Sequence, residues 1–96
     1  MPTLTFREDA GKHRFEALCD GELAGFLEYK FRDGAIDLKH TETLAAFGGK
    51  GVGSFLAGSA LDHVRASGEK VIPSCDFVAG YIRKHPEYQD LLATSP

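Results

Sequence analysis

Hydrophobic and polar residues alternate through most of the first forty positions. Four runs show this pattern: Leu4 to Phe6 and residues 14–19, 22–31 and 35–41. Period-two alternation is typical of strands that bury one face. Asp20-Gly21 and Asp33-Gly34 separate the later runs, and Asp-Gly between two such runs is a strong hairpin signal. We therefore predict four consecutive strands in an antiparallel meander.

The last of these runs carries a histidine on its apolar side. Strict alternation predicts Ile36, Leu38 and His40 on one face of the strand. Asp37 and Lys39 then fall on the other face. A histidine on an apolar face is either satisfied by a neighbouring carbonyl group or available as a base.

After residue 48 the hydrophobic period changes from two to that of a helix. Five apolar residues and one histidine recur at helical spacing: Val52, Phe55, Leu56, Ala60, His63 and Val64. Ser67-Gly68 is a good helix stop. Residues 70–73 predict a short strand, residues 76–84 a second helix and residues 87–92 a last helical turn.

Residues 35–73 thus form a strand, loop, helix and strand. Such a unit normally crosses over right-handedly and leaves its two strands parallel. Ligands tend to bind at the carboxyl ends of parallel strands. His40 and Thr41 lie at one of these ends and Cys75 follows the other, with the glycine-rich loop on the same side. We expect these features to converge on one site in an α+β fold.

Composition narrows the class of protein. Residues 1–96 are enough for one domain. Eleven basic residues against fourteen acidic ones give a net charge of −3, which argues against a nucleic-acid binder. No apolar run approaches the roughly 18–20 residues that span a membrane, and no signal pattern is visible, so we expect a cytosolic protein. Cys19 and Cys75 should then be free thiols.

The loop before the first helix favours an anion. Its residues are Gly48, Gly49, Lys50, Gly51, Val52, Gly53 and Ser54. Glycines let backbone N–H groups approach a ligand, and the helix start adds free N–H groups and a positive dipole end. Neither the Walker A pattern nor the dinucleotide fingerprint fits the spacing. The alternative is a flexible loop that only leads into the helix.

These features together resemble the GCN5-related N-acetyltransferase superfamily, and in particular its smallest, YjdJ-type members. The similarity covers nearly the whole chain from His40 onward and is most specific in residues 73–88. It implies a minimal fold of this family and a loop that binds the pyrophosphate of acetyl coenzyme A. Gly48 stands where the usual loop has Gln or Arg, so one side-chain contact is absent. The two acceptor-binding helices of larger relatives are also missing between the first two strands.

The resemblance also assigns candidate roles. His40 and Cys75 match the candidate catalytic pair of the small members, and Tyr81 matches the tyrosine that often protonates the departing thiolate. Each has a plainer role as a packed residue. A thiol in the first turn of a helix is favoured as thiolate. The further candidate cofactor contacts are Thr41, Arg83 and Lys84, beside the loop residues. No Cys/His spacing typical of a metal site is present.

The leading prediction is an acetyl-coenzyme A-dependent N-acetyltransferase that acts on an amine. Acetyl transfer could pass through Cys75, or His40 could deprotonate an amine that attacks the thioester directly. The alternative is a non-catalytic module that binds acetyl coenzyme A. The open side of so small a domain leaves room for a homodimer to complete the acceptor wall. We expect no nucleic-acid or membrane partner.

Overall fold

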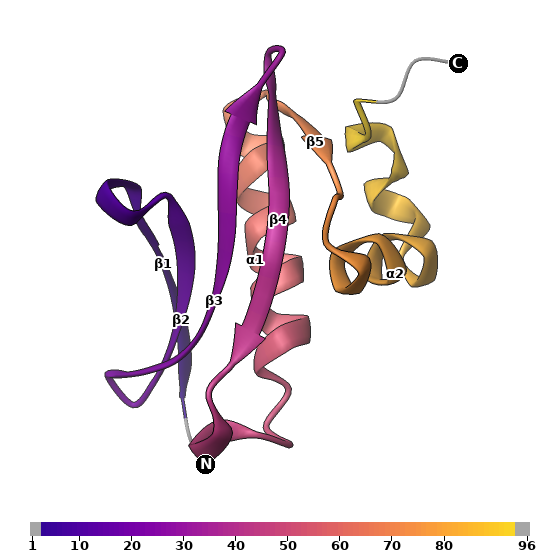
Figure 1. Ribbon diagram of the computed structural model, residues 1–96. Coiled ribbons are helices and arrows are strands. Elements are labelled where there is room, and N and C mark those ends of the chain that lie inside the picture. The colour runs from indigo at the N-terminus through magenta and orange to yellow at the C-terminus, as the bar shows by residue number, and fades with distance from the viewer. Residues whose placement is uncertain (1–2, 94–96) are drawn as a thin grey trace.

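The computed structural model describes residues 3–93 and contains one five-stranded sheet with two α-helices (Figure 1). The elements are β1 Leu4–Asp9, β2 Arg14–Cys19, β3 Glu22–Arg32, β4 Ala35–Thr43, α1 Val52–Ser67, β5 Lys70–Ile72 and α2 Asp76–Lys84. Short 3₁₀ turns are η1 Ala10–Lys12, η2 Ala45–Phe47 and η3 Pro86–Leu91. The strand order is β1-β2-β3-β4-β5, antiparallel up to β4 and parallel between β4 and β5. The predicted meander, parallel unit and α+β class are confirmed.

Both Asp-Gly hairpins have the backbone that their residues favour. Asp20 and Gly21 have φ values of 49° and 88°, and Asp33 and Gly34 have values of 51° and 77°. Two consecutive residues with positive φ match the twist of the flanking strands. These turns fix the end of β2, both ends of β3 and the start of β4.

Helix α1 covers one face of the sheet and lies behind β3 and β4 in Figure 1. Its buried residues are Val52, Leu56, Ala57, Ala60, Leu61 and Val64. All of them except Ala57 join Phe15, Leu27, Ile36 and Leu38 of the sheet in one hydrophobic core. In residues 3–93 no helix lies in front of β1–β4 in this view, so that face of the sheet is open.

One extra residue in β4 changes the faces predicted from sequence. The β3–β4 register shifts between Glu28 and Tyr29, so that Glu28 is opposite His40 and Tyr29 is opposite Leu38. Lys39 is the unopposed residue, which makes a β-bulge. His40 therefore lies on the face opposite to Leu38, and Thr41 takes its place on the α1 face. The expected grouping of His40 with Ile36 and Leu38 is wrong for this reason.

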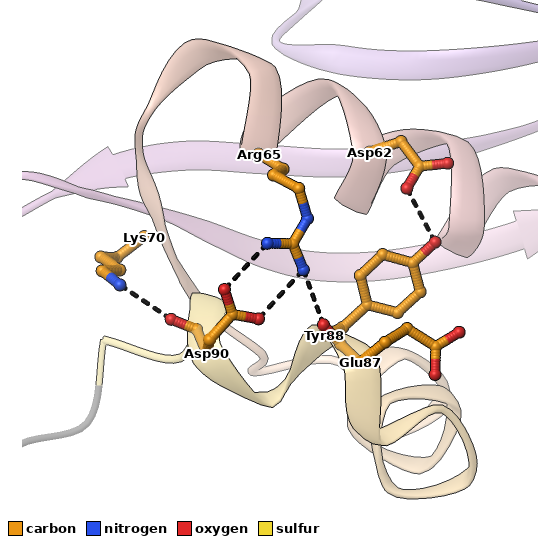
Figure 2. Close-up of polar contacts among 6 residues, drawn as sticks. All are labelled: Asp62, Arg65, Lys70, Glu87, Tyr88 and Asp90. Atoms are coloured by element: carbon orange, nitrogen blue, oxygen red, sulfur yellow. Dashed lines mark hydrogen bonds and ion pairs between the residues drawn. The ribbon is translucent and has the colours of Figure 1, made fainter.

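The last described residues are fastened to α1 and β5 by a polar cluster (Figure 2). Arg65 donates to both carboxylate oxygens of Asp90, at 2.8 and 3.0 Å, and to the carbonyl oxygen of Glu87 at 2.6 Å. Tyr88 donates to Asp62 at 2.8 Å. Lys70 reaches the Asp90 carbonyl oxygen at 2.7 Å. The cluster holds η3, and with it the end of α2, against α1.

Within residues 3–93, none of the helices combines the length and the apolar character that crossing a membrane requires.

Candidate active site

The site lies where β4 and β5 part. β5 pairs with β4 only through Ala35–Asp37, and β4 continues beyond this pairing to Thr43. The chain leaves β5 through Pro73 and starts α2 directly beside β4. The backbone N–H of Cys75 donates to the carbonyl oxygen of Leu38 at 2.9 Å. This bond fixes the start of α2 at the fork between the two strands.

Cys75 points its sulfur toward β4. Its Sγ lies 3.3 Å from Oγ1 of Thr41, and the residue is 8% exposed. Burial raises the pKa of the thiol, but the Thr41 hydroxyl and the backbone N–H groups of Val78, Phe77 and Thr41 lower it more, so the pKa of Cys75 is below its ordinary value. The thiolate expected at a helix start thus has a set of donors aimed at it.

His40 is at the same level of β4 but on the open face. Its Nε2 lies 3.2 Å from Oε1 of Glu42, and both side chains are about half exposed. The structure therefore brings Thr41, and not His40, into contact with Cys75. A role of His40 as a base remains a prediction.

The glycine-rich loop has the conformation that an anion site needs. Gly49 and Gly51 have φ values of 78° and 75°, which residues other than glycine rarely adopt. Gly51 is the N-cap of α1 and supplies no side-chain cap. The N–H groups of the first turn, from Val52 to Ser54, precede any possible i−4 partner within the helix. They can be satisfied by a phosphate, and Lys50 lies exposed in the same loop.

Two contacts that sequence reasoning missed bring this loop close to the fork. A Cβ on Gly25 of β3 would lie 2.6 Å from the Glu42 carbonyl oxygen and 2.8 Å from Cγ1 of Val52. A Cβ on Gly53 would lie 3.0 Å from the ring of Phe77. Gly25 thus allows α1 to start close to the sheet, and Phe77 covers the loop from α2. A glycine inside a strand pattern was the available signal for the first contact.

A cavity of about 430 Å³ opens beside the loop, between the start of α1 and α2. Its lining residues are Ser54, Asp76, Phe77, Gly80, Tyr81, Arg83, Lys84 and His85. It brings together four of the predicted site residues, namely Ser54, Tyr81, Arg83 and Lys84. Two cations beside free backbone N–H groups suit a phosphorylated ligand.

Tyr81 is half-buried, but its hydroxyl packs closely against α1. Its ring stacks on His85 with centroids 4.1 Å apart, and its hydroxyl would be 2.7 Å from a Cβ on Gly58. Burial raises the pKa of Tyr81, and the charges of Asp62 and Glu87 raise it further. The phenol is therefore protonated at neutral pH and can act as a hydrogen-bond donor or an acid.

The fork between two parallel strands, the glycine-rich helix start and the cavity lined by Arg83 and Lys84 are the features of an α+β protein that binds a phosphorylated ligand. Comparison with known proteins gives the family. The family profile of GCN5-related N-acetyl-transferases matches residues 14–91, and the chain belongs to this family.

Individual relatives agree with this assignment. The NMR solution structure of a GCN5-like protein from Staphylococcus aureus superposes with a TM-score of 0.72 at 28% identity, covering 100% of this chain and 94% of that one. Protein NATD1 of Xenopus tropicalis is 34% identical over 61 residues, which are 64% of this chain and 56% of NATD1. Mouse NATD1 gives the same values. The similarity thus spans little more than half the length of these two relatives.

Proposed function

We propose that this protein is an acetyl-coenzyme A-dependent N-acetyltransferase that transfers the acetyl group to a primary amine. The observation that carries the proposal is the fork between β4 and β5, with a thiol held at its base and an uncapped helix start beside it. Membership of an acetyltransferase family supports it independently.

Acetyl coenzyme A fits the residues of this region as a substrate. The N–H groups at the start of α1 suit its pyrophosphate, and an added Cβ on Gly49 or Gly51 would meet nothing within 4 Å, so the loop surface is open. The edge of β4 at residues 39–43, beyond its contacts with β5 and Cys75, suits the amide groups of the pantetheine arm. Arg83 and Lys84 suit the remaining phosphate.

Three side chains are proposed to serve the chemistry. Cys75 can attack the thioester carbonyl as a nucleophile. His40, on the open face, can take the proton of the incoming amine. Tyr81 can donate a proton to the departing thiolate, because its raised pKa keeps the phenol protonated.

A non-catalytic acetyl-coenzyme A-binding module is the second candidate. The open face of the sheet favours it, because only η1 and its flanking residues connect β1 to β2 and no described helix forms an acceptor wall. A second copy of the chain could supply that wall, and homodimer formation remains a prediction. So does the cytosolic location.

Two measurements separate the candidates. We expect acetyl coenzyme A at millimolar concentration to raise Tm, since a ligand that binds only the folded state stabilises it. Release of free coenzyme A with a panel of primary amines then reports turnover. A raised Tm without turnover on any amine favours the binding module. An unchanged Tm contradicts both candidates.

Cys75→Ala separates binding from chemistry. We expect this variant to keep the Tm increase with acetyl coenzyme A and to lose most of the turnover. Cys19→Ala is the matched control, because Cys19 is also buried and free but lies in β2, away from the fork. Equal turnover in Cys75→Ala and Cys19→Ala would exclude a catalytic role for the Cys75 thiol.

A further inference from the structure

We propose that Thr41 is the positioning residue of Cys75, and that its hydroxyl and backbone N–H, with two N–H groups of α2, hold the sulfur as a thiolate that accepts the acetyl group. This inference rests on the proposed acetyl transfer and deepens it. It replaces a Cys–His pair by a set of uncharged donors.

The geometry around the sulfur comes from two elements locked together. The bond from the Cys75 N–H to the Leu38 carbonyl oxygen, 2.9 Å long, ties the start of α2 to β4. Thr41 lies three residues further along β4, and its Oγ1 is 3.3 Å from Sγ. The backbone N–H groups of Phe77 and Val78, in the first turn of α2, help to lower the pKa of the thiol. The hydroxyl of Thr41 and the start of α2 therefore lie on two elements that are fixed against each other at the sulfur.

The bulge in β4 determines which side chain is available. Because Lys39 has no partner on β3, Thr41 lies opposite the fully buried Leu27 and shares its face. With strict alternation and no bulge, His40 would occupy the Leu38 face. The bulge thus places a hydroxyl at the thiol and the imidazole on the other side of the sheet.

Charged groups near the thiol are few. On the two elements that pack around it, the titratable side chains nearest in sequence are Asp76 of α2 and Asp37, Lys39, His40 and Glu42 of β4. Asp37, His40 and Glu42 lie on the opposite face of the sheet, by the register of β4. Hydrogen bonds from dipoles, which do not titrate, are therefore the main stabilisation of the thiolate. We expect the pH dependence of Cys75 reactivity to be independent of His40.

The chemical step balances without a further reactant. The Cys75 thiolate attacks the carbonyl carbon of acetyl coenzyme A, a new S–C bond forms, and the bond to the coenzyme A sulfur breaks. The coenzyme A thiolate leaves with that electron pair and takes up a proton. The amine then attacks the acetyl-cysteine, the S–C bond breaks, the thiolate is regenerated, and the proton of the amine passes to the solvent or to His40.

The test is the pH profile of Cys75 alkylation by iodoacetamide, followed by peptide mass in a Cys19→Ala background. The wild-type thiol should give a single midpoint below the usual value of about 8.5. Thr41→Val should raise the midpoint by about one pH unit, since a hydrogen bond to a charged group is worth that much. Thr41→Ser should retain the low midpoint and His40→Ala should leave it unchanged.

Three outcomes overturn the proposal: a wild-type midpoint equal to that of the urea-unfolded chain, an equal midpoint in Thr41→Val, or a shift with His40→Ala. Far-UV circular dichroism checks that each variant is folded. If Thr41→Val does not fold, Thr41→Ala replaces it as the variant that lacks the hydroxyl.

A second readout tests the acetyl step alone. After incubation with acetyl coenzyme A at pH 7, intact mass should show acetyl on Cys75, formed about tenfold more slowly in Thr41→Val, since the thiolate fraction falls tenfold per unit of pKa. A low midpoint without acetylation refutes the covalent step. The alkylation profile does not involve acetyl coenzyme A, so it is informative even if the proposed function fails.

Discussion

Gly58, in the middle of α1, lies close to the hydroxyl of Tyr81. This contact allows a test of the position of that hydroxyl, the candidate acid. A Cβ added at Gly58 would lie 2.7 Å from Tyr81 Oη but 3.5 Å from Cζ. The close approach is therefore to the hydroxyl alone. The perturbation is Gly58→Ala, made in the wild-type chain and in Tyr81→Phe.

The magnitude follows from two opposing contributions. Gly→Ala in a helix interior gains about 1 kcal/mol of stability. In the wild type, this gain is opposed by the clash with the hydroxyl, and such overpacking costs about 1–3 kcal/mol. In Tyr81→Phe the hydroxyl is absent, so the substitution should stabilise by about 1 kcal/mol. The two backgrounds should thus differ by about 1–3 kcal/mol.

Urea unfolding followed by far-UV circular dichroism measures this difference. For a chain of this size it corresponds to a difference in Tm of about 4–8 °C per kcal/mol. Gly80→Ala on α2 is the control, because its Cβ would approach only the mobile end of Arg83, at 3.5 Å, and it should stabilise both backgrounds equally. If Gly58→Ala changes the stability by the same amount in both backgrounds, the Tyr81 hydroxyl is not where the structure has it.

Two further predictions concern the loop and the open face. Gly51→Ala and Gly34→Ala place a Cβ at similar positive φ values, 75° and 77°, so each should lower the free energy of unfolding by about 1–2 kcal/mol. In isothermal titration, only Gly51→Ala should weaken coenzyme A binding. Equal affinity in both variants would contradict the loop as the phosphate site. Glu16 is buried between Arg7 and Arg14, at 2.6 and 2.8 Å; burial raises its pKa, but the two guanidinium groups lower it more, so the pKa is below its usual value. A lowered pKa in the folded state gives stability that is present above about pH 4.3 and is lost as pH falls further. Glu16→Gln should therefore reduce the fall of Tm between about pH 5 and 3. An unchanged slope of Tm against pH would show that this carboxylate does not contribute to stability.

The architecture could be predicted from sequence because its signals are local. Both Asp-Gly turns fix hairpins, and the change of period after residue 48 separates sheet from helix. The predicted helix over residues 76–84 has the bounds of α2. The turns η1 and η2 were not predicted, because three residues are too few to show a period.

The arrangement of the site was only partly predictable, for a reason that lies in strand register. Alternation in a single strand cannot reveal an extra residue, since a bulge is defined by the partner strand. One such residue, Lys39, was enough to exchange the faces of His40 and Thr41. Thr41 and Cys75 lie together at the fork, as expected, but Thr41 was not predicted as the neighbour of the thiol.

This exchange gives the two faces of the fork different chemistry. On the α1 side, Cys75 and Thr41 lie beside the glycine-rich loop, where uncharged donors can stabilise negative charge on sulfur and on phosphate. On the open side, His40 and Glu42 form a half-exposed pair 3.2 Å apart, which suits proton transfer with the solvent or an amine. An acyl donor and an acceptor that approached from opposite faces would therefore each meet groups suited to them. Within residues 3–93, no helix covers the open side. The specificity of this small member of the family should accordingly depend on what covers that face.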